Sequence, residues 1–226
     1  MNRTSMFNRV EMKAKARVLL HKNIFMLGSM AAIPFIVELL GNQWVPHISN
    51  TTLIKFFVSS QIVGMVSIVA TYFLVVMCVE LKKNPTTEFA YISSKMSLQG
   101  FVNYGVKMVL FNIVINIGLL FLFLPGIYLT YRYFFVRYIA IEQPKLSIKE
   151  TFALSKVYSK GMTLDLIVLA LSFILWLIAS IMLYGIPSLY TTPYIILTMM
   201  FVYYECKQRY EQQEEYQEDG LDGNKL

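Results

Sequence analysis

The sequence has few of the residues that build catalytic centres. Among its 226 residues are two histidines, His21 and His47, and two cysteines, Cys78 and Cys206. It has no Cys-x-x-Cys pair, no His-Glu-x-x-His helix and no phosphate-cradling glycine loop. We therefore predict a protein that is not an enzyme and that holds no metal and no cofactor. The two cysteines fall near expected cytoplasmic helix ends, which favours reduced thiols over a disulfide.

Charge is also scarce, whereas apolar residues are abundant. Charged residues make up 15% of the chain and hydrophobic residues 56%, against about a quarter charged in soluble proteins. Apolar runs approach or exceed about 18 residues, the length of a membrane-spanning helix. The pattern predicts an all-α fold, a polytopic transmembrane helical bundle of about six spans with short cytoplasmic interfacial helices. The expected spans are residues 24–40, 56–81, 106–124, 125–141, 164–183 and 193–204.

Lysine and arginine are distributed unevenly between the expected loops. With a cytoplasmic N-terminus, only Lys55 falls near the outer side. We therefore predict a multi-pass protein of the cell membrane with both termini cytoplasmic. Three regions follow: a basic interfacial helix over residues 1–22, a six-span domain over 23–205, and a disordered acidic tail over 206–226.

The same asymmetry indicates which partners to expect. It accounts for the net charge of +6 without nucleic acid. The basic residues would instead face membrane lipids, including those with anionic headgroups. Other membrane proteins are the second class of expected partner.

One stretch places an arginine inside an expected span. Pro125 and Gly126 predict a helix break, because proline opens a helix and glycine permits a tight turn. Arg132 would then lie about 10 Å along the new helix, where an isolated charge is unfavourable. Asn116 reaches a similar depth across the turn, and Glu38 is the only acid in the outer half. These three residues form a candidate intramembrane polar cluster.

This polar cluster admits three interpretations. In the first, Glu38 and Asn116 satisfy Arg132 and the cluster is structural. In the second, it lines a polar cavity that binds a lipid headgroup, a peptide or an ion. In the third, Arg132 extends alone to the outer surface. Nearer the inner face, Arg137 and Asp165 are expected to pair, with Asp165 also complementing the dipole of its helix.

Two further patterns concern helix packing and helix starts. Small residues recur at helical spacing in the second expected span, at Ser60, Gly64, Ser67 and Thr71. Such a stripe lets two helices approach closely in lipid, and a substrate groove is the alternative. A serine with a glutamate three residues later, at 147 and 150, has the capping-box spacing that opens a helix.

The segment from residue 124 to residue 161 resembles a known family. The matching residues are Leu124-Pro125-Gly126-Ile127-Tyr128-Leu129, Tyr131-Arg132-Tyr133, the Glu142 to Pro144 loop, Lys149-Glu150, and Leu154-Ser155-Lys156 before Gly161. They resemble an uncharacterised family of bacterial six-span membrane proteins, a domain of unknown function with an L-P-G-I-Y-L-x-Y-R-Y motif. They are more distantly similar to the membrane domain of glycerophosphodiester phosphodiesterases. The resemblance implies an all-α integral membrane fold and brings no catalytic residues.

These observations lead to two hypotheses about function. The first is a non-catalytic integral membrane protein that acts through lipid or membrane-protein partners. Its expected role is envelope maintenance or protection from membrane-active peptides. The alternative is a small transporter or permease-like subunit that uses the cluster around Arg132.

Overall fold

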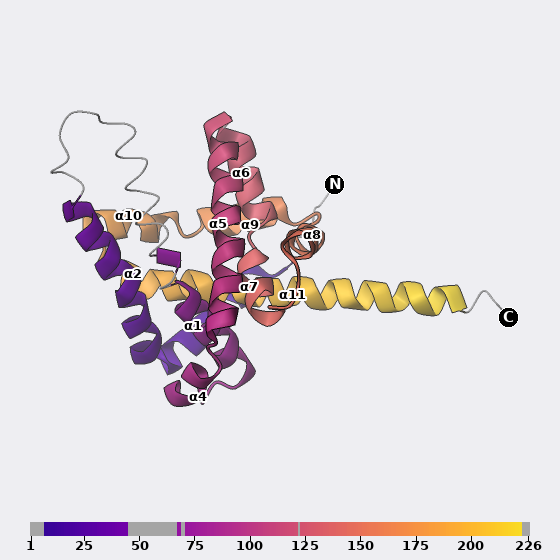
Figure 1. Cartoon of the computed structure of the whole chain (residues 1–226), viewed down its shortest axis with the longest axis horizontal. Helices are drawn as coiled ribbons and strands as arrows, with labels where there is room; N and C mark the ends of the chain where they lie inside the picture. The colour runs from indigo at the N-terminus through magenta and orange to yellow at the C-terminus, as the bar shows by residue number, and fades with distance from the viewer. Residues whose placement is uncertain (1–6, 45–66, 69–70, 122, 223–226) are drawn as a thin grey trace.

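The computed structural model describes residues 7–44, 67–68, 71–121 and 123–222 (Figure 1). Every element in these ranges is an α-helix, so the predicted all-α class is confirmed. Residues 71–83 are also helical. The elements are α1 (Arg9–Lys22), α2 (Ile24–Trp44), α4 (Phe89–Ser94), α5 (Leu98–Phe121), α6 (Phe123–Arg132), α7 (Val136–Glu142), α8 (Ile148–Tyr158), α9 (Thr163–Leu171), α10 (Ile174–Met182) and α11 (Ser188–Asp222).

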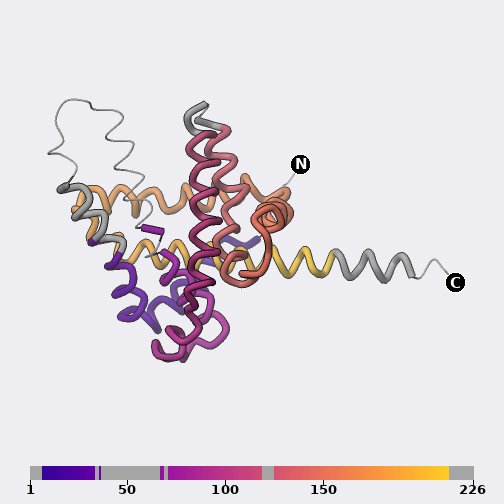
Figure 2. Tube along the Cα trace, viewed as in Figure 1, coloured from indigo at the N-terminus to yellow at the C-terminus, as the bar shows by residue number. Residues whose placement is uncertain are grey.

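Long helix α11 organises the molecule. Helices α1, α2, α8 and α10 all pack against it, and its buried residues include Leu197, Met200 and Tyr203. Helices α5 and α6 form an antiparallel hairpin that runs across α11 instead of alongside it (Figures 1 and 2). The helices therefore do not form one bundle of parallel spans.

Helix α1 lies on the protein through one apolar face. Its buried residues are Met12, Ala16, Leu19 and Leu20, which helical periodicity places on one side. Lys13 Nζ donates to Ser172 Oγ at 2.5 Å and lies 4.3 Å from the centroid of the Phe173 ring. The contact falls where α9 ends and α10 begins. The N-terminal helix is thus docked against the C-terminal third of the chain.

Two helical stretches in the described ranges are long and apolar enough to cross a membrane. They are Leu98–Gly118 and Thr163–Met182, and 22% and 17% of their apolar windows are buried. Core helices of a soluble protein are mostly buried, and a signal sequence lies at the N-terminus. Both stretches are mostly exposed, and both lie far from residue 1. A shorter apolar helix covers Ile24–Ile33.

The structure does not support the six predicted spans. The expected fourth span, residues 125–141, divides into α6 and α7, and residues 133–135 between them are not helical. Ten-residue α6 is about 15 Å long, half of the about 30 Å of a hydrocarbon core. The helix ends where Ser159 Oγ donates to the Arg132 carbonyl at 2.8 Å, a contact between distant parts of the chain. Half of the expected second span, residues 56–66 and 69–70, lies outside the described residues.

The acidic segment after residue 205 is helical where the sequence predicts disorder. Helix α11 continues to Asp222 and extends beyond the other helices (Figure 1). The segment is rich in glutamate and glutamine, which favour helix. Adding residues to an existing helix also avoids the unfavourable nucleation step.

The reversal between α5 and α6 comes before the Pro125-Gly126 pair. Helix α6 begins at Phe123, so Pro125 lies in its first turn, where a missing N–H costs no helical hydrogen bond. Gly126 is buried, and its Cα lies 3.2 Å from where a Cβ on Gly118 would be. This glycine pair therefore brings the two helices of the hairpin close together.

Half of the predicted small-residue stripe can be placed. Ser60 and Gly64 lie outside the described residues. Ser67 and Thr71 are half-buried, and Thr71 Oγ1 donates to the Ser67 carbonyl at 2.7 Å. The helical residues that follow are mostly buried in the core. Whether the stripe is a packing seam stays a prediction.

Candidate functional site

Arg132 ends α6, and its guanidinium is held within its own helix. Nη1 donates to the Tyr128 hydroxyl at 2.8 Å, one turn earlier, and Cζ lies 5.6 Å from that ring's centroid. The Arg132 carbonyl accepts from Ser159 Oγ at 2.8 Å and from Ser155 Oγ at 3.4 Å. Ser155 belongs to α8, and Ser159 is the residue that caps its C-terminus. Arg132 therefore joins the end of α6 to α8 through its backbone and to Tyr128 through its side chain.

The other two members of the predicted polar cluster are placed only in part. Glu38 falls within α2, but its side chain lies outside the described residues. Asn116 is half-buried in α5, two residues before Gly118, which faces α6. Two residues correspond to about 200° around a helix. Asn116 therefore lies on the side of α5 away from α6 and away from Arg132.

The predicted inner-face pair involves two residues on different helices. Arg137 in α7 places Cζ 4.6 Å above the centroid of the Phe134 ring, a cation–π contact. Its Nε is buried and has no hydrogen-bond partner in the described residues. Asp165 is half-buried in the first turn of α9, where a negative charge complements the helix dipole. The pairing of the two stays a prediction.

A second polar cluster joins α7 to α11 and was not predicted as a site. Glu142 Oε2 accepts from the Tyr203 hydroxyl at 2.6 Å and from Lys207 Nζ at 2.8 Å. The Lys207 and Glu142 side chains are 17% and 19% exposed. Nearby, the Tyr138 hydroxyl donates to the Ile196 carbonyl at 2.9 Å. Three donors from α7 and α11 thus fix the relative position of the two helices.

Lys82 adds a cation beside this cluster. Its Nζ lies 3.3 Å from the centroid of the Tyr204 ring. Burial lowers the pKa of Lys82, and the Glu142 carboxylate acts in the opposite direction. The tyrosine face thus partly replaces the water that the ammonium loses.

A comparison with known protein families identifies the family of this chain. The family described as "Protein of unknown function (DUF975)" matches residues 88–210, which is over half of the chain. The chain belongs to this family. The DUF975 match includes the α5–α6 hairpin, Arg132, Arg137, Glu142 and Asp165. No curated protein and no solved structure matches the chain.

The match confirms the coarser part of the resemblance drawn from the sequence. The chain is a member of an uncharacterised family, DUF975. The membrane nature of that family and the similarity to the phosphodiesterase membrane domain stay predictions.

Thiol groups in this DUF975 protein are buried. Cys78 and Cys206 are both free. Burial raises the pKa of the Cys206 thiol to about 12, and its Sγ lies 3.5 Å from Met162 Sδ. A thiol at that pKa is protonated at neutral pH and reacts slowly. Within the described ranges, no three His, Cys, Asp or Glu side chains are grouped closely enough to hold a metal ion.

Proposed function

We propose that this protein is a non-catalytic, multi-pass integral membrane protein of the cell membrane that acts through lipids or other membrane proteins. Helix α10 is the observation that carries the proposal. None of its residues is buried, and Leu175, Ile181 and Met182 are 75%, 83% and 74% exposed. Burying each such side chain is worth about 1.5–3 kcal/mol in water. A helix that is apolar all round belongs in lipid or in the core of a large protein.

Two charged groups, Arg132 and Glu142, favour a scaffold over a transporter. Arg132 has a hydrogen-bond partner in Tyr128, and Glu142 has two donors, so both of these side chains are partnered within the protein itself. A transport pathway needs polar groups that a substrate can reach. We assign the protein to envelope maintenance or to protection against membrane-active peptides. Both roles require contact with lipid and neither requires a reacting group.

The first test of this proposal is extraction from membranes. We expect the full chain to stay in the membrane fraction after washing with alkaline carbonate and to be released by detergent. A chain held only by surface charge would be released by the wash or by high salt, because salt screens such contacts. Release by either treatment would contradict the membrane proposal.

Topology can be tested with single cysteines at exposed positions. The background is Cys78→Ala with Cys206→Ala, and the reporters are Asn84→Cys, Ile186→Cys and Gln212→Cys. With both termini cytoplasmic, a membrane-impermeant maleimide should label position 186 in intact cells, and should label 84 and 212 only after the cells are opened. Labelling of position 84 or 212 in intact cells would contradict this orientation.

A further inference from the structure

A cavity of about 670 Å³ lies between the start of α5 and the loop that joins α7 to α8. From α5 it is lined by Gly100, Asn103 and Lys107, and from the loop by Lys145 and Ser147, among others. Asn103 Nδ2 donates to the Pro144 carbonyl at 3.3 Å and so holds the loop against α5. Gln99, Lys145 and Ser147 are exposed, so a ligand can reach the cavity from outside. Its volume is within the roughly 300–1,000 Å³ of small-molecule sites.

Lys107 is the most unusual residue of this cavity. Its side chain is 3% exposed, and its Nζ has no hydrogen-bond partner in the part of the chain that the structure describes. Gly100, Asn103 and Lys107 are spaced by one helical turn each, so they share the face of α5 that lines the cavity. A buried ammonium without a partner is strongly unfavourable. A bound anion would supply the missing partner.

The surroundings of the cavity are electropositive. Its lining includes Lys107 and Lys145 and no aspartate or glutamate. The N-termini of α5 and α8 both reach it, and Ser97 Oγ caps α5 by accepting from the Gly100 amide at 2.9 Å. Free amides in a first helical turn favour a negative ligand.

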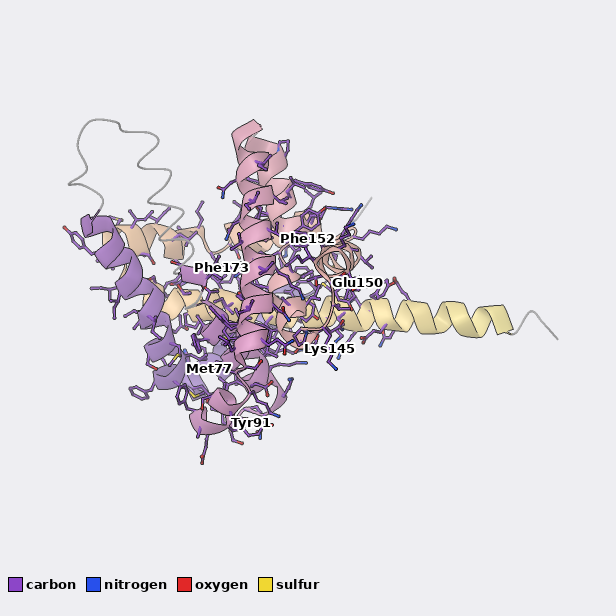
Figure 3. The ribbon with its side chains drawn as sticks, viewed as in Figure 1. Met77, Tyr91, Lys145, Glu150, Phe152 and Phe173 are labelled. Carbon is purple, nitrogen blue, oxygen red and sulfur yellow. The ribbon has the colours of Figure 1, made fainter. Side chains whose placement is uncertain are left out.

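The two acids that flank the loop, Glu142 and Glu150, are both engaged, and Glu142 accepts from Tyr203 and Lys207. Glu150 Oε2 accepts from the Ser147 amide at 2.8 Å, and Ser147 Oγ accepts from the Glu150 amide at 3.3 Å. Figure 3 shows Lys145 and Glu150 on the same side of α5. The amide and the hydroxyl of Ser147 lower the pKa of the Glu150 carboxyl. Lys107 Nζ has no hydrogen-bond partner among the described residues, so neither acid is paired with it.

We propose that this cavity binds a phosphate group, carried by a phosphomonoester or a phosphodiester, with Lys107 as its buried cationic donor. A phosphate offers several acceptor oxygens to an ammonium and to first-turn amides at once. Val106, Leu146 and Ile148 add apolar lining that suits an organic substituent. The expected span of residues 106–124 begins at the cavity, and Lys107 is its second residue. If the proposed membrane embedding is correct, the headgroup phosphates of phospholipids lie at this level, whereas a water-soluble phosphate ester requires no membrane.

Thermal melting of the purified full chain in neutral detergent tests the proposal. The probes are glycerol 3-phosphate, with chloride at equal ionic strength as control, and short-chain phosphatidylglycerol, with the phosphate-free diacylglycerol as control. A ligand that binds the folded state raises the melting temperature by mass action. We expect one probe or both to do so, and Lys107→Met to weaken that binding by about tenfold or more, since it removes a charged hydrogen bond. The matched control is Lys160→Met, an exposed lysine outside the cavity, which should bind as the wild type does.

The variants also separate binding from folding. Without ligand, Lys107→Met should melt no lower than the wild type, because it removes an unpaired buried charge. Lys145→Met should weaken binding less, because Lys145 is exposed. A response to phosphatidylglycerol alone identifies a headgroup site, and a response to glycerol 3-phosphate alone identifies a soluble ester. Three results would overturn the proposal: no probe exceeds its control, Lys107→Met binds as well as the wild type, or Lys107→Met melts far lower without ligand. The carbonate wash decides the membrane proposal separately.

Discussion

Replacing Glu142 with leucine is expected to lower the free energy of unfolding by up to about 3 kcal/mol, the low end of the cost of removing one partner from a buried ion pair, because this pair is only partly buried. The change leaves the Lys207 ammonium and the Tyr203 hydroxyl without the oxygen that accepts from both. The loss should appear in chemical denaturation of the detergent-solubilised protein followed by circular dichroism.

Two companion variants sharpen the Glu142 experiment. Combining Glu142→Leu with Lys207→Met removes both charges and should recover part of the loss, because no unpaired ion remains. The half-exposed pair Glu11–Lys15 is the matched control, and Glu11→Gln should cost less than about 1 kcal/mol. If Glu142→Leu and Glu11→Gln have the same small effect, the α7–α11 contact does not stabilise the fold.

Replacing Gly118 with leucine is expected to separate the α5–α6 hairpin and destabilise the protein by about 1–3 kcal/mol. A Cβ at this position would lie 3.2 Å from the Gly126 Cα and 3.0 Å from Leu129 Cδ1. The Gly126 atom closest to the new Cβ is a backbone atom, the Cα. It cannot move aside as the end of a flexible side chain would. The measurement is the thermal melting temperature in detergent.

Gly105 provides the control for Gly118 within the same helix. Nothing lies within 4 Å of a Cβ built there. Gly105→Leu should therefore be neutral or stabilising, by up to about 1 kcal/mol from helix propensity. Equal destabilisation by the two variants would mean that the close approach of α5 and α6 is not the cause.

The parts of the fold that depend on local sequence were predictable. The expected span 164–183 matches the stretch Thr163–Met182 closely, whereas the expected span 106–124 overlaps Leu98–Gly118 but begins later. The spacing of Ser147 and Glu150 placed the start of α8, and both reciprocal bonds of the capping box are present. These features depend only on residues that are close to one another in the sequence, so the sequence alone is enough to predict them.

The parts that depend on distant contacts were not predictable. From hydropathy, residues 125–141 are predicted to form one apolar span. In the structure α6 ends at Arg132, whose carbonyl accepts hydrogen bonds from the hydroxyls of Ser155 and Ser159. The spacing along a helix also says nothing about the angle at which another helix crosses it. For the same reason the sequence placed Lys107 on the cytoplasmic side, at the start of the span 106–124, without showing that a loop 40 residues later would enclose it.

The docking of α1 determines when folding of the chain can be completed. Lys13 and Ser172 are 159 residues apart, and His21 and Tyr190, whose side chains meet at 3.2 Å, are 169 residues apart. Helix α1 therefore leaves the ribosome 159 or more residues before these partners. Its apolar face must wait, exposed or held by a chaperone or the membrane surface, until α11 has emerged. The docking of α1 onto α11 is therefore a non-local contact, of the kind that slows folding.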